Sequence, residues 1–419
     1  MRIILISVFC FLTGVLNAQT KTYLADLAAL KSILQKTPSY KAQIKGDKLS
    51  HYNSLYDRLT LDTTNNPNNF QYFYNLAQLL FPFRDNHLGF YQLPNYANFK
   101  TKESIDSFTK TKEFLDYPAI KINIDSLKEV LAIKPDSSIE GIYHYGKFYS
   151  VGLFKSSDKE YIGVIVNSEV NLWQKGMVAI HLYEYSPNMF KAIYGHPLFK
   201  NFILQTNEKY RNQSLVNSYF YGSYSQDIYS KQFQLNDYIN VPKNVSKFEL
   251  KNINDNVQYL LIRSFQRNNA TIQESKNFYD SIKNTLTASN LILDLRNNEG
   301  GARKETKKYF TLLKKYTRKG HLYILLNNET LSQAEIFTLQ LKKLKNVTTI
   351  GQTTKGMLTY GSNYGRRQKL PSGKFEIYPT DMKGNKKLLQ YENYGIIPDI
   401  SLNQNSDWIG QVIKIIQEK

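Results

Sequence analysis

Residues 291–301 read Leu-Ile-Leu-Asp-Leu-Arg-Asn-Asn-Glu-Gly-Gly, an apolar run that ends in polar residues and paired glycines. Strand-like and helix-like runs alternate on either side of this stretch. The expected strands are 259–265, 291–295, 322–326 and 347–351, and the expected helices are 271–286, 304–316 and 334–344. Such alternation predicts a mostly parallel sheet with right-handed crossover helices. We therefore expect an α/β core, with its active site at the carboxyl ends of the strands.

Two other sequence patterns precede this core. Between residues 21 and 80, apolar residues recur three and four positions apart, which predicts helices. Between residues 138 and 202, short alternating runs rich in Tyr, Val and Ile predict a small antiparallel β unit. We therefore expect an N-terminal helical segment, a β-rich unit and an α/β core, with boundaries at 19–130, 131–250 and 251–419.

The first residues have the pattern of a secretory signal peptide over residues 1–18. Met1 and Arg2 precede an apolar run over 3–16, and a small residue, Ala18, stands at the expected cleavage point. The single cysteine, Cys10, lies inside this segment, so the mature chain would carry neither a disulfide nor a thiolate nucleophile. No later stretch approaches the ~20 apolar residues of a spanning helix. We expect an exported protein, periplasmic or extracellular.

Composition indicates a globular protein with a basic surface. The chain has 419 residues, of which 42% are hydrophobic and 21% charged, enough for two or three packed units. The net charge of +19 could indicate a surface that binds polyanions. The lysines are scattered in short clusters, however, and none forms a long basic run. A solvated basic surface is therefore favoured, and no nucleic-acid partner is expected.

The paired glycines at 300–301 are the first candidate for a role in catalysis. Glycines at a strand end allow the backbone to approach a ligand closely and to turn its amides inward, as an oxyanion hole requires. The alternative is an ordinary strand-to-helix turn. Asp294 and Arg296 are expected to form a structural ion pair that holds this turn, because an unpaired charge beside a buried strand is costly.

Ser332 is the second candidate, in the stretch 326–337, which has the pattern of a strand, a short loop and a helix start. A hydroxyl there meets free amides and roughly half a positive charge, which can stabilise a developing oxyanion. The alternative is that Ser332 only caps the helix, with Glu335 completing a capping box.

Together, four ordered blocks resemble the core of the C-terminal-processing (tail-specific) and tricorn-type serine peptidases. They are 293–301, the Ser-x-x-Glu of 332–335, Gly-Gln-Thr-Thr-Lys-Gly at 351–356, and Tyr-Glu-Asn-Tyr-Gly-Ile-Ile-Pro-Asp-Ile at 391–400. The resemblance covers about residues 251–402. It implies a crotonase-like fold, Ser332 as the nucleophile, and an oxyanion hole from the amides of Gln333 and of Gly300 or Gly301. It implies peptide or protein substrates and neither a cofactor nor a metal.

The resemblance leaves the general base open between a lysine and a histidine. Bacterial processing members use a lysine at the position where this chain has Met357, and Lys355 lies two positions earlier. Tricorn-like members use an upstream histidine, and Asp-Asn-His-Leu-Gly at 85–89 resembles their block. His87 is therefore expected to be the base, since an imidazole takes and returns a proton near neutral pH.

The carboxylate that orients His87 also has two candidates. Glu392 stands in a block similar to the tricorn-type ending, and the alternative for it is a solvated surface residue. Asp85 would share a strand face with His87 if that segment were extended. If neither base acts, the chain would be a weak or inactive ligand-binding protein on the same scaffold.

Overall fold

The computed structural model describes residues 21–62, 66–223, 227–232, 237–362 and 366–418, so the predicted signal peptide and Cys10 lie outside the described residues. The chain divides into two compact units. Unit 1 comprises Met1–Phe233 and Ser362–Lys383, and unit 2 comprises Gln234–Gly361 and Gly384–Lys419. Each unit has its own sheet and its own hydrophobic core.

Unit 2 is a three-layer α/β structure. Its elements are β9 (Phe248–Asn254), β10 (Val257–Ile262), α8 (Asn269–Ile282), β11 (Asn290–Asp294), α9 (Arg303–Tyr316), β12 (His321–Leu326), α10 (Gln333–Leu341), β13 (Val347–Gly351), η2 (Lys386–Leu388), β16 (Ile400–Ser401) and α11 (Trp408–Gln417). Among the described residues the sheet has six strands in the order β16-β13-β12-β11-β10-β9. All neighbours are parallel except β9, which runs antiparallel to β10.

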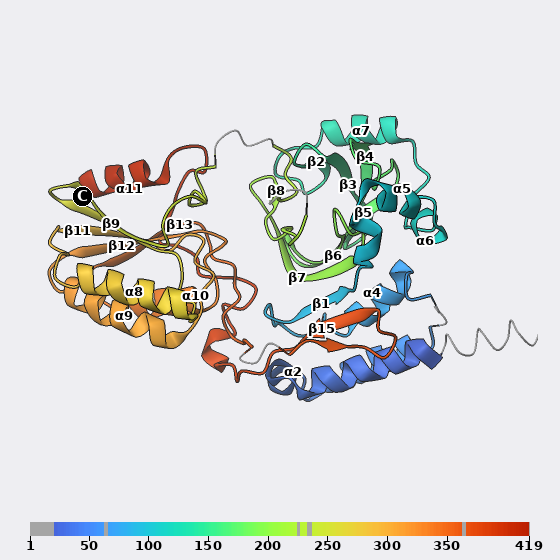
Figure 1. Ribbon diagram of the computed structural model, residues 1–419, viewed down its shortest axis with the longest axis horizontal. Coiled ribbons are helices and arrows are strands. Elements are labelled where there is room, and N and C mark those ends of the chain that lie inside the picture. The colour runs from blue at the N-terminus through green and yellow to red at the C-terminus, as the bar shows by residue number, and fades with distance from the viewer. Residues whose placement is uncertain (1–20, 63–65, 224–226, 233–236, 363–365, 419) are drawn as a thin grey trace, which may run out of the picture. The chain divides into compact units, whose positions relative to one another are not determined.

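Alternate residues of each central strand of unit 2 pack on opposite faces. Leu293 and Ile324 face α8, α9 and α10, whereas Ile292 and Tyr323 face α11. Figure 1 shows these helices on the two sides of the sheet. A strand buried on both faces must be apolar throughout, which explains the continuous Leu/Ile runs of β11 and β12.

The seven strands and helices predicted for this core are all present. The predicted helix at 304–316 is α9, and the predicted strands at 322–326 and 347–351 are β12 and β13, within one residue at each end. The largest difference is at the C-terminal end of a helix, where α8 ends at Ile282, four residues before the predicted end. The predicted α/β core with a mostly parallel sheet is confirmed for unit 2.

Unit 1 begins with helices, as predicted. Residues 21–36 are helical, and α2 (Pro38–Gln43), α3 (Asp47–Thr60) and α4 (Phe70–Gln78) follow. Thr37 starts α2, because its side chain accepts a hydrogen bond from the Tyr40 amide. Apolar residues of these helices, including Leu27 and Phe73, are buried in one core with strand residues.

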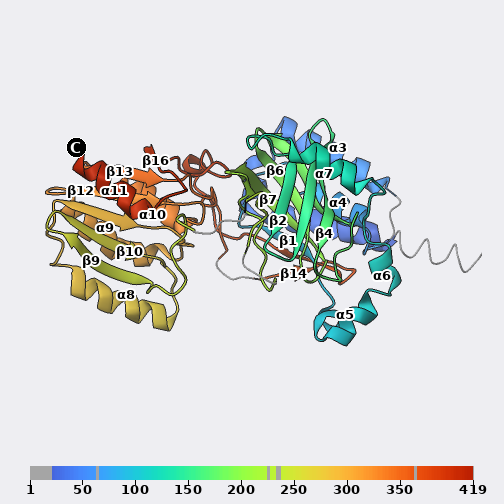
Figure 2. The same ribbon diagram turned by 90° about the horizontal axis from the view of Figure 1, so that it is seen from above.

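The sheet of unit 1 is larger than the predicted small antiparallel unit. Its strands are β1 (Gly89–Gln92), β2 (Gly141–Tyr145), β3 (Tyr149–Ser157), β4 (Glu160–Ser168), β5 (Val178–Ser186), β6 (Met189–Gly195), β7 (Phe202–Arg211), β8 (Ser214–Leu215), β14 (Gln368–Lys369) and β15 (Phe375–Tyr378). Over the described part of the chain they form a ten-stranded sheet, ordered β14-β15-β1-β7-β6-β5-β4-β3-β2 with β8 on β7. All pairs are antiparallel, and the strands run alongside one another in Figure 2.

Short helices precede the β-rich part of unit 1. They are η1 (Tyr96–Phe99), α5 (Lys102–Phe108), α6 (Lys112–Leu115) and α7 (Ile124–Ala132). Leu127 and Leu131 of α7 pack against β-strand residues such as Val164.

The segment 362–383 leaves the core in sequence and belongs to unit 1. Its strand β15 pairs with β1, with Ile377 opposite Phe90, and Phe375 is fully buried in the core of unit 1. The Ser372 amide donates to the Asp26 carboxylate at 2.8 Å. The sequence interpretation placed this segment in the α/β core, because nothing in its composition signals the return to unit 1.

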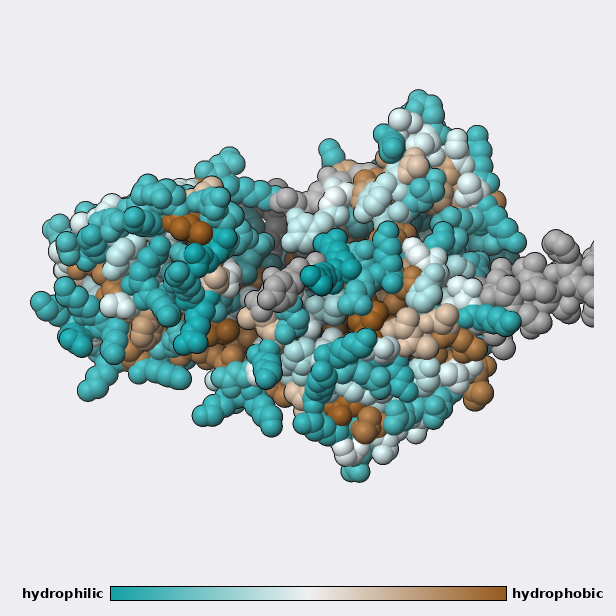
Figure 3. Space-filling model, turned by 60° about the horizontal axis from the view of Figure 1, so that its bottom comes forward, coloured by the Kyte–Doolittle hydropathy of each residue, from teal (hydrophilic) through white to brown (hydrophobic). Residues whose placement is uncertain are grey.

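The surface drawn in Figure 3 is predominantly hydrophilic, with hydrophobic atoms in small groups. Within the described ranges, we find no helix with the length and apolar character needed to cross a bilayer.

Candidate active site

Ser332 occupies the sharp turn between β12 and α10. Its backbone has a φ of 58° and a ψ of −121°, a conformation that costs a non-glycine residue about 1–3 kcal/mol. Three other helix caps that are not glycine differ: Thr37, Asn123 and Asn268 have φ values of −69°, −71° and −102°, and their side chains accept first-turn amides. The cap whose backbone angles resemble those of Ser332 is a glycine, Gly46, with a φ of 55° and a ψ of −133°. The predicted capping box of Ser332 and Glu335 is present, but a cap does not by itself require the strained backbone of Ser332.

Glu335 holds this turn from the inside of unit 2. Its Oε2 accepts hydrogen bonds from the amides of Ser332 at 3.0 Å and Met357 at 2.9 Å. Its Oε1 accepts from the Gly356 amide at 2.9 Å and from the Thr354 hydroxyl at 2.5 Å. Burial, with a smaller contribution from the charge of Glu392, raises the pKa of Glu335 to about 6, although its hydrogen bonds act in the opposite direction.

The glycine turn after β11 lies against the same serine. Gly300 has a φ of +83°, and a Cβ there would lie 2.7 Å from the Gln333 nitrogen and 2.9 Å from the Ser332 Cβ. Only a glycine can bring a backbone this close. The Gly300 amide itself donates to the Asn298 side chain at 2.9 Å. Gly301 has a φ of +134° and is exposed.

Asp294 and Arg296 form the predicted ion pair beneath this turn. Arg296 Nη2 lies 2.7 Å from Asp294 Oδ2, and both side chains are almost fully buried. Tyr259 donates its hydroxyl to the same carboxylate at 2.9 Å, and Arg296 Nη1 donates to the Tyr238 carbonyl at 3.1 Å. The prediction of a structural pair is confirmed.

Glu392 is fully buried, so the alternative that it is a solvated surface residue is wrong. It accepts hydrogen bonds from the amides of Leu358 at 3.1 Å and Thr359 at 2.8 Å. Its charge acts on Glu335, and the two carboxylates together hold the loop at 354–359. Sequence and structure thus bring Ser332, Gln333, Gly300, Glu335 and Glu392 into one region of unit 2.

Lys355 lies on the same loop but is engaged with another carboxylate. Its Nζ is 3.3 Å from both carboxylate oxygens of Glu329. This ion pair uses the ammonium form of the side chain, whereas a general base needs the neutral amine. Met357, the residue at the position of the family lysine, contributes its amide to Glu335.

His87 and Asp85 belong to unit 1. They lie in a turn closed by a hydrogen bond from the Leu88 amide to the Asp85 carbonyl at 3.3 Å, so the condition under which Asp85 would share a strand face with His87 is not met. The Asp85 carboxylate accepts from the Thr380 hydroxyl at 2.6 Å. Burial lowers the pKa of His87 from 6.5 to about 4.

The contribution of Glu335 was missed in the sequence interpretation, which treated the residue only as half of a capping box. Three of the donors to its carboxylate, Thr354, Gly356 and Met357, lie in a separate block of the sequence. The spacing of about twenty residues between carboxylate and donors gives no periodic signal, so only the fold shows the contact.

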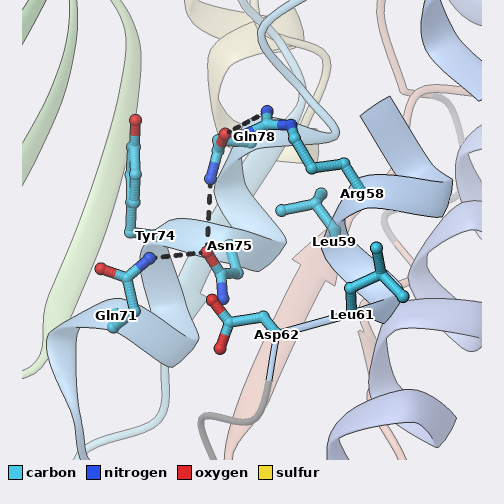
Figure 4. A pocket seen from close by; sticks show the side chains of 8 residues that line it. All are labelled: Arg58, Leu59, Leu61, Asp62, Gln71, Tyr74, Asn75 and Gln78. Carbon is cyan, nitrogen blue, oxygen red and sulfur yellow. Dashed lines mark hydrogen bonds between the residues drawn. The ribbon is translucent and has the colours of Figure 1, made fainter. Parts of the chain in front are cut away.

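A separate cavity of about 340 Å³ lies in unit 1 among residues that were not predicted as site residues (Figure 4). Gln71 and Gln78 both donate to the Asn75 side-chain oxygen, at 2.8 and 3.4 Å, and Arg58 donates to Gln78 at 3.1 Å. Most polar side chains in this lining therefore bond to one another.

Comparison with known families finds that part of this chain is similar to a family of peptidases. The match is to Peptidase family S41 over residues 302–402, which include Ser332, Glu335 and Glu392. The predicted resemblance to the C-terminal-processing and tricorn-type peptidases is thereby confirmed.

Solved structures are similar to this chain at low identity. A lipoprotein from Streptococcus agalactiae is 22% identical, covering 41% of this chain and 70% of its own, with a TM-score of 0.29. The photosystem II D1 C-terminal processing protease is 12% identical, with coverages of 95% and 97% and a TM-score of 0.34. Mature CPAF is 12% identical, with coverages of 95% and 97% and a TM-score of 0.41. No residue's role follows from likenesses at this level, and no curated protein matches the sequence.

Proposed function

We propose that this chain is an exported serine endopeptidase with a crotonase-like core and Ser332 as its nucleophile. The Ser332 hydroxyl attacks a peptide carbonyl while His87 takes its proton. The imidazolium then returns a proton to the leaving amine, and water hydrolyses the acyl-enzyme by the same route. Glu392 orients and stabilises the imidazolium. Export rests on the predicted signal peptide at residues 1–18.

The observation that carries the proposal is the strained backbone of Ser332 at a strand-to-helix turn. Such a turn presents a serine hydroxyl at the start of a helix, as the nucleophile elbow does in unrelated hydrolases. Strain of this size persists only where surrounding contacts enforce it. Here Glu335 holds the Ser332 amide, and the Gly300 backbone packs against the serine.

The amides of Gln333 and Gly301 are favoured as oxyanion donors. Of the three amides named from the sequence, that of Gly300 already donates to Asn298. Gln333 is the first residue of α10, where amides point out of the helix and carry the positive end of its dipole. Loss of one such donor costs roughly 10²–10³-fold in rate.

The pKa of His87 is compatible with a role as the base, although burial makes this imidazole a weaker proton acceptor than a free one. With a pKa of about 4, the imidazole is neutral at pH 7 and can accept a proton. Lys355 is the weaker candidate because of its ion pair with Glu329. Asp85, which accepts from Thr380, is likewise a weaker candidate than Glu392 for orienting the imidazole.

A fluorophosphonate probe tests the proposal, because it reacts only with an activated serine. We expect the mature protein to be labelled at Ser332, Ser332→Ala to lose the label, and His87→Ala to react about 10²–10⁴-fold more slowly. Ser289→Ala, in the same unit, and His51→Ala, at an exposed position of α3, are the matched controls and should react like the wild type.

Two outcomes would count against parts of this proposal. If the folded wild type is not labelled, the chain is a ligand-binding protein on a peptidase scaffold. If Ser332 is labelled equally fast in His87→Ala but slowly in Lys355→Ala, the base is Lys355.

A further inference from the structure

One buried carboxylate in unit 2 joins the backbone of Ser332 to a loop twenty residues away. Of the four donors to Glu335, one is the Ser332 amide and the other three come from Thr354, Gly356 and Met357. A capping box needs only the first of these bonds. The other three show that the carboxylate does more than begin a helix.

Burying this carboxylate costs free energy, so its place in the fold needs compensating contacts. Glu335 is 0% exposed, and taking a charge out of water costs several kcal/mol unless it is well compensated. The four donors to it, three backbone amides and one hydroxyl, are all neutral, and the nearby charge of Glu392 raises its pKa. Glu392 takes the next two amides of the same loop, those of Leu358 and Thr359.

We propose that Glu335 is a positioning residue whose carboxylate fixes the strained backbone of Ser332 and locks the loop at 354–357 beside it. This inference rests on the proposed role of Ser332 as nucleophile. Both carboxylate oxygens are needed, because each one accepts from two donors. A carboxamide in the same place can accept on one oxygen only, and its NH₂ group would face a backbone N–H.

The inference also predicts a pH dependence of the reaction. Only the carboxylate accepts on both oxygens, so the reaction slows as the pH falls through about 6, the pKa of Glu335. This pKa lies above the ordinary value of 4.5, so the folded chain binds the proton more tightly than the unfolded chain does. Protonation of Glu335 by itself therefore stabilises the fold, and the loss of reactivity near pH 6 is not unfolding.

Glu335→Gln tests the inference, with the rate constant of fluorophosphonate labelling of Ser332 measured between pH 4.5 and 8. We expect labelling at pH 7.5 to slow by about 10²-fold, as for a misplaced reacting group. We also expect the decrease in rate near pH 6 to disappear. With a peptide substrate, kcat should fall and KM should stay close to that of the wild type.

Glu305→Gln is the matched control, a buried glutamate of α9 whose partners are Arg267 and Lys308. It should label like the wild type at every pH. If Glu335→Gln fails to fold by circular dichroism, Thr354→Val removes one of the four donors and Thr354→Ser keeps it. Labelling should then be slowed by valine and restored by serine.

Failure of this inference can be told apart from failure of the proposed function. No labelling of wild-type Ser332 overturns the nucleophile. Labelling of the wild type together with an unchanged rate and pH profile in Glu335→Gln overturns the positioning role alone. In the same way, equal rates in Thr354→Val and Thr354→Ser overturn it if the glutamine variant does not fold.

Discussion

At the scale of single residues, Ser332 and Gly300 depend on each other. Ser332 has a strained backbone, and the backbone of Gly300 packs directly against it, which is possible because glycine has no side chain. The backbone of each residue is also fixed by a hydrogen bond, because the Ser332 amide donates to Glu335 and the Gly300 amide donates to Asn298. The site is therefore preorganised by backbone contacts as much as by side chains.

Gly300→Ala should therefore abolish most reactivity. The new Cβ would meet the Gln333 nitrogen at 2.7 Å and the Leu331 carbonyl oxygen at 2.9 Å, so the turn has to move. We expect labelling of Ser332 to slow at least about 10²-fold. The control is Gly373→Ala, which also has a positive φ, +69°, but has no atom within 4 Å of the new Cβ. Equal labelling of the two variants would contradict the account in which the close approach of Gly300 to the serine turn is needed for reactivity.

Much of this site could be predicted from residue order, and some of it could not. The glycine turn, Ser332 and the Asp294–Arg296 pair follow from strand ends, because parallel strands end at the same edge of a sheet. The occupied Gly300 amide could not be predicted, since it depends on a side chain two residues away curling back. The turn at 85–88 was also missed, because an Asp-Asn-His segment has no periodicity to separate a turn from a strand.

At the scale of elements, the end of β11 depends on one buried network. Asp294 is fully buried and its carboxylate is shared between Arg296 and Tyr259. The guanidinium is also tied to the Tyr238 carbonyl. The network fixes where the strand stops and the glycine turn begins.

Arg296→Met should cost about 3–5 kcal/mol in the free energy of unfolding, because it leaves the Asp294 charge buried and unpaired. Urea unfolding followed by circular dichroism gives the value. The double variant Asp294→Asn with Arg296→Met removes the charge as well, and we expect it to be more stable than Arg296→Met alone. A double variant at least as unstable as the sum of the single ones would contradict this account.

Elements of unit 2 were predictable because each one carries a complete local signal. Buried strands read as continuous apolar runs, and the intervening helices have a period of 3.6 residues. The sheet of unit 1 was only partly predictable for a topological reason. Strands β1 and β15 are separated by almost three hundred residues. Their pairing, with Phe90 opposite Ile377, cannot be predicted from the sequence of either short strand.

At the scale of the whole molecule, segment 362–383 packs in unit 1 and contributes to the stability of that unit. Phe375 is fully buried there, and its ring lies 5.2 Å from that of Tyr72 and stacks on it. The Thr380 hydroxyl of this segment also donates a hydrogen bond to the Asp85 carboxylate. Its neighbours in sequence on both sides nevertheless belong to unit 2.

Phe375→Ala should therefore weaken unit 1 rather than unit 2. A buried Phe→Ala change costs about 3–5 kcal/mol. Hydrogen exchange measured by mass spectrometry should show lower protection in β6 and β7, with β11 and β12 close to the wild type. Phe337→Ala, in the core of unit 2, should show the reverse pattern. Equal loss of protection in both sheets would mean that the units unfold together.

The assignment of segment 362–383 to unit 1 also determines how unit 2 could be produced as a separate fragment. A fragment cut only at residue 234 would keep β14 and β15 but would lose β1, the partner of β15. Phe375 and Ile377 would then be exposed, which favours aggregation. The residues of unit 2 that flank this segment lie close together, because a Cβ on Gly384 would be 2.5 Å from the Tyr360 ring. A few glycine and serine residues could therefore bridge them, yielding a soluble fragment in which the serine turn is studied without the larger sheet.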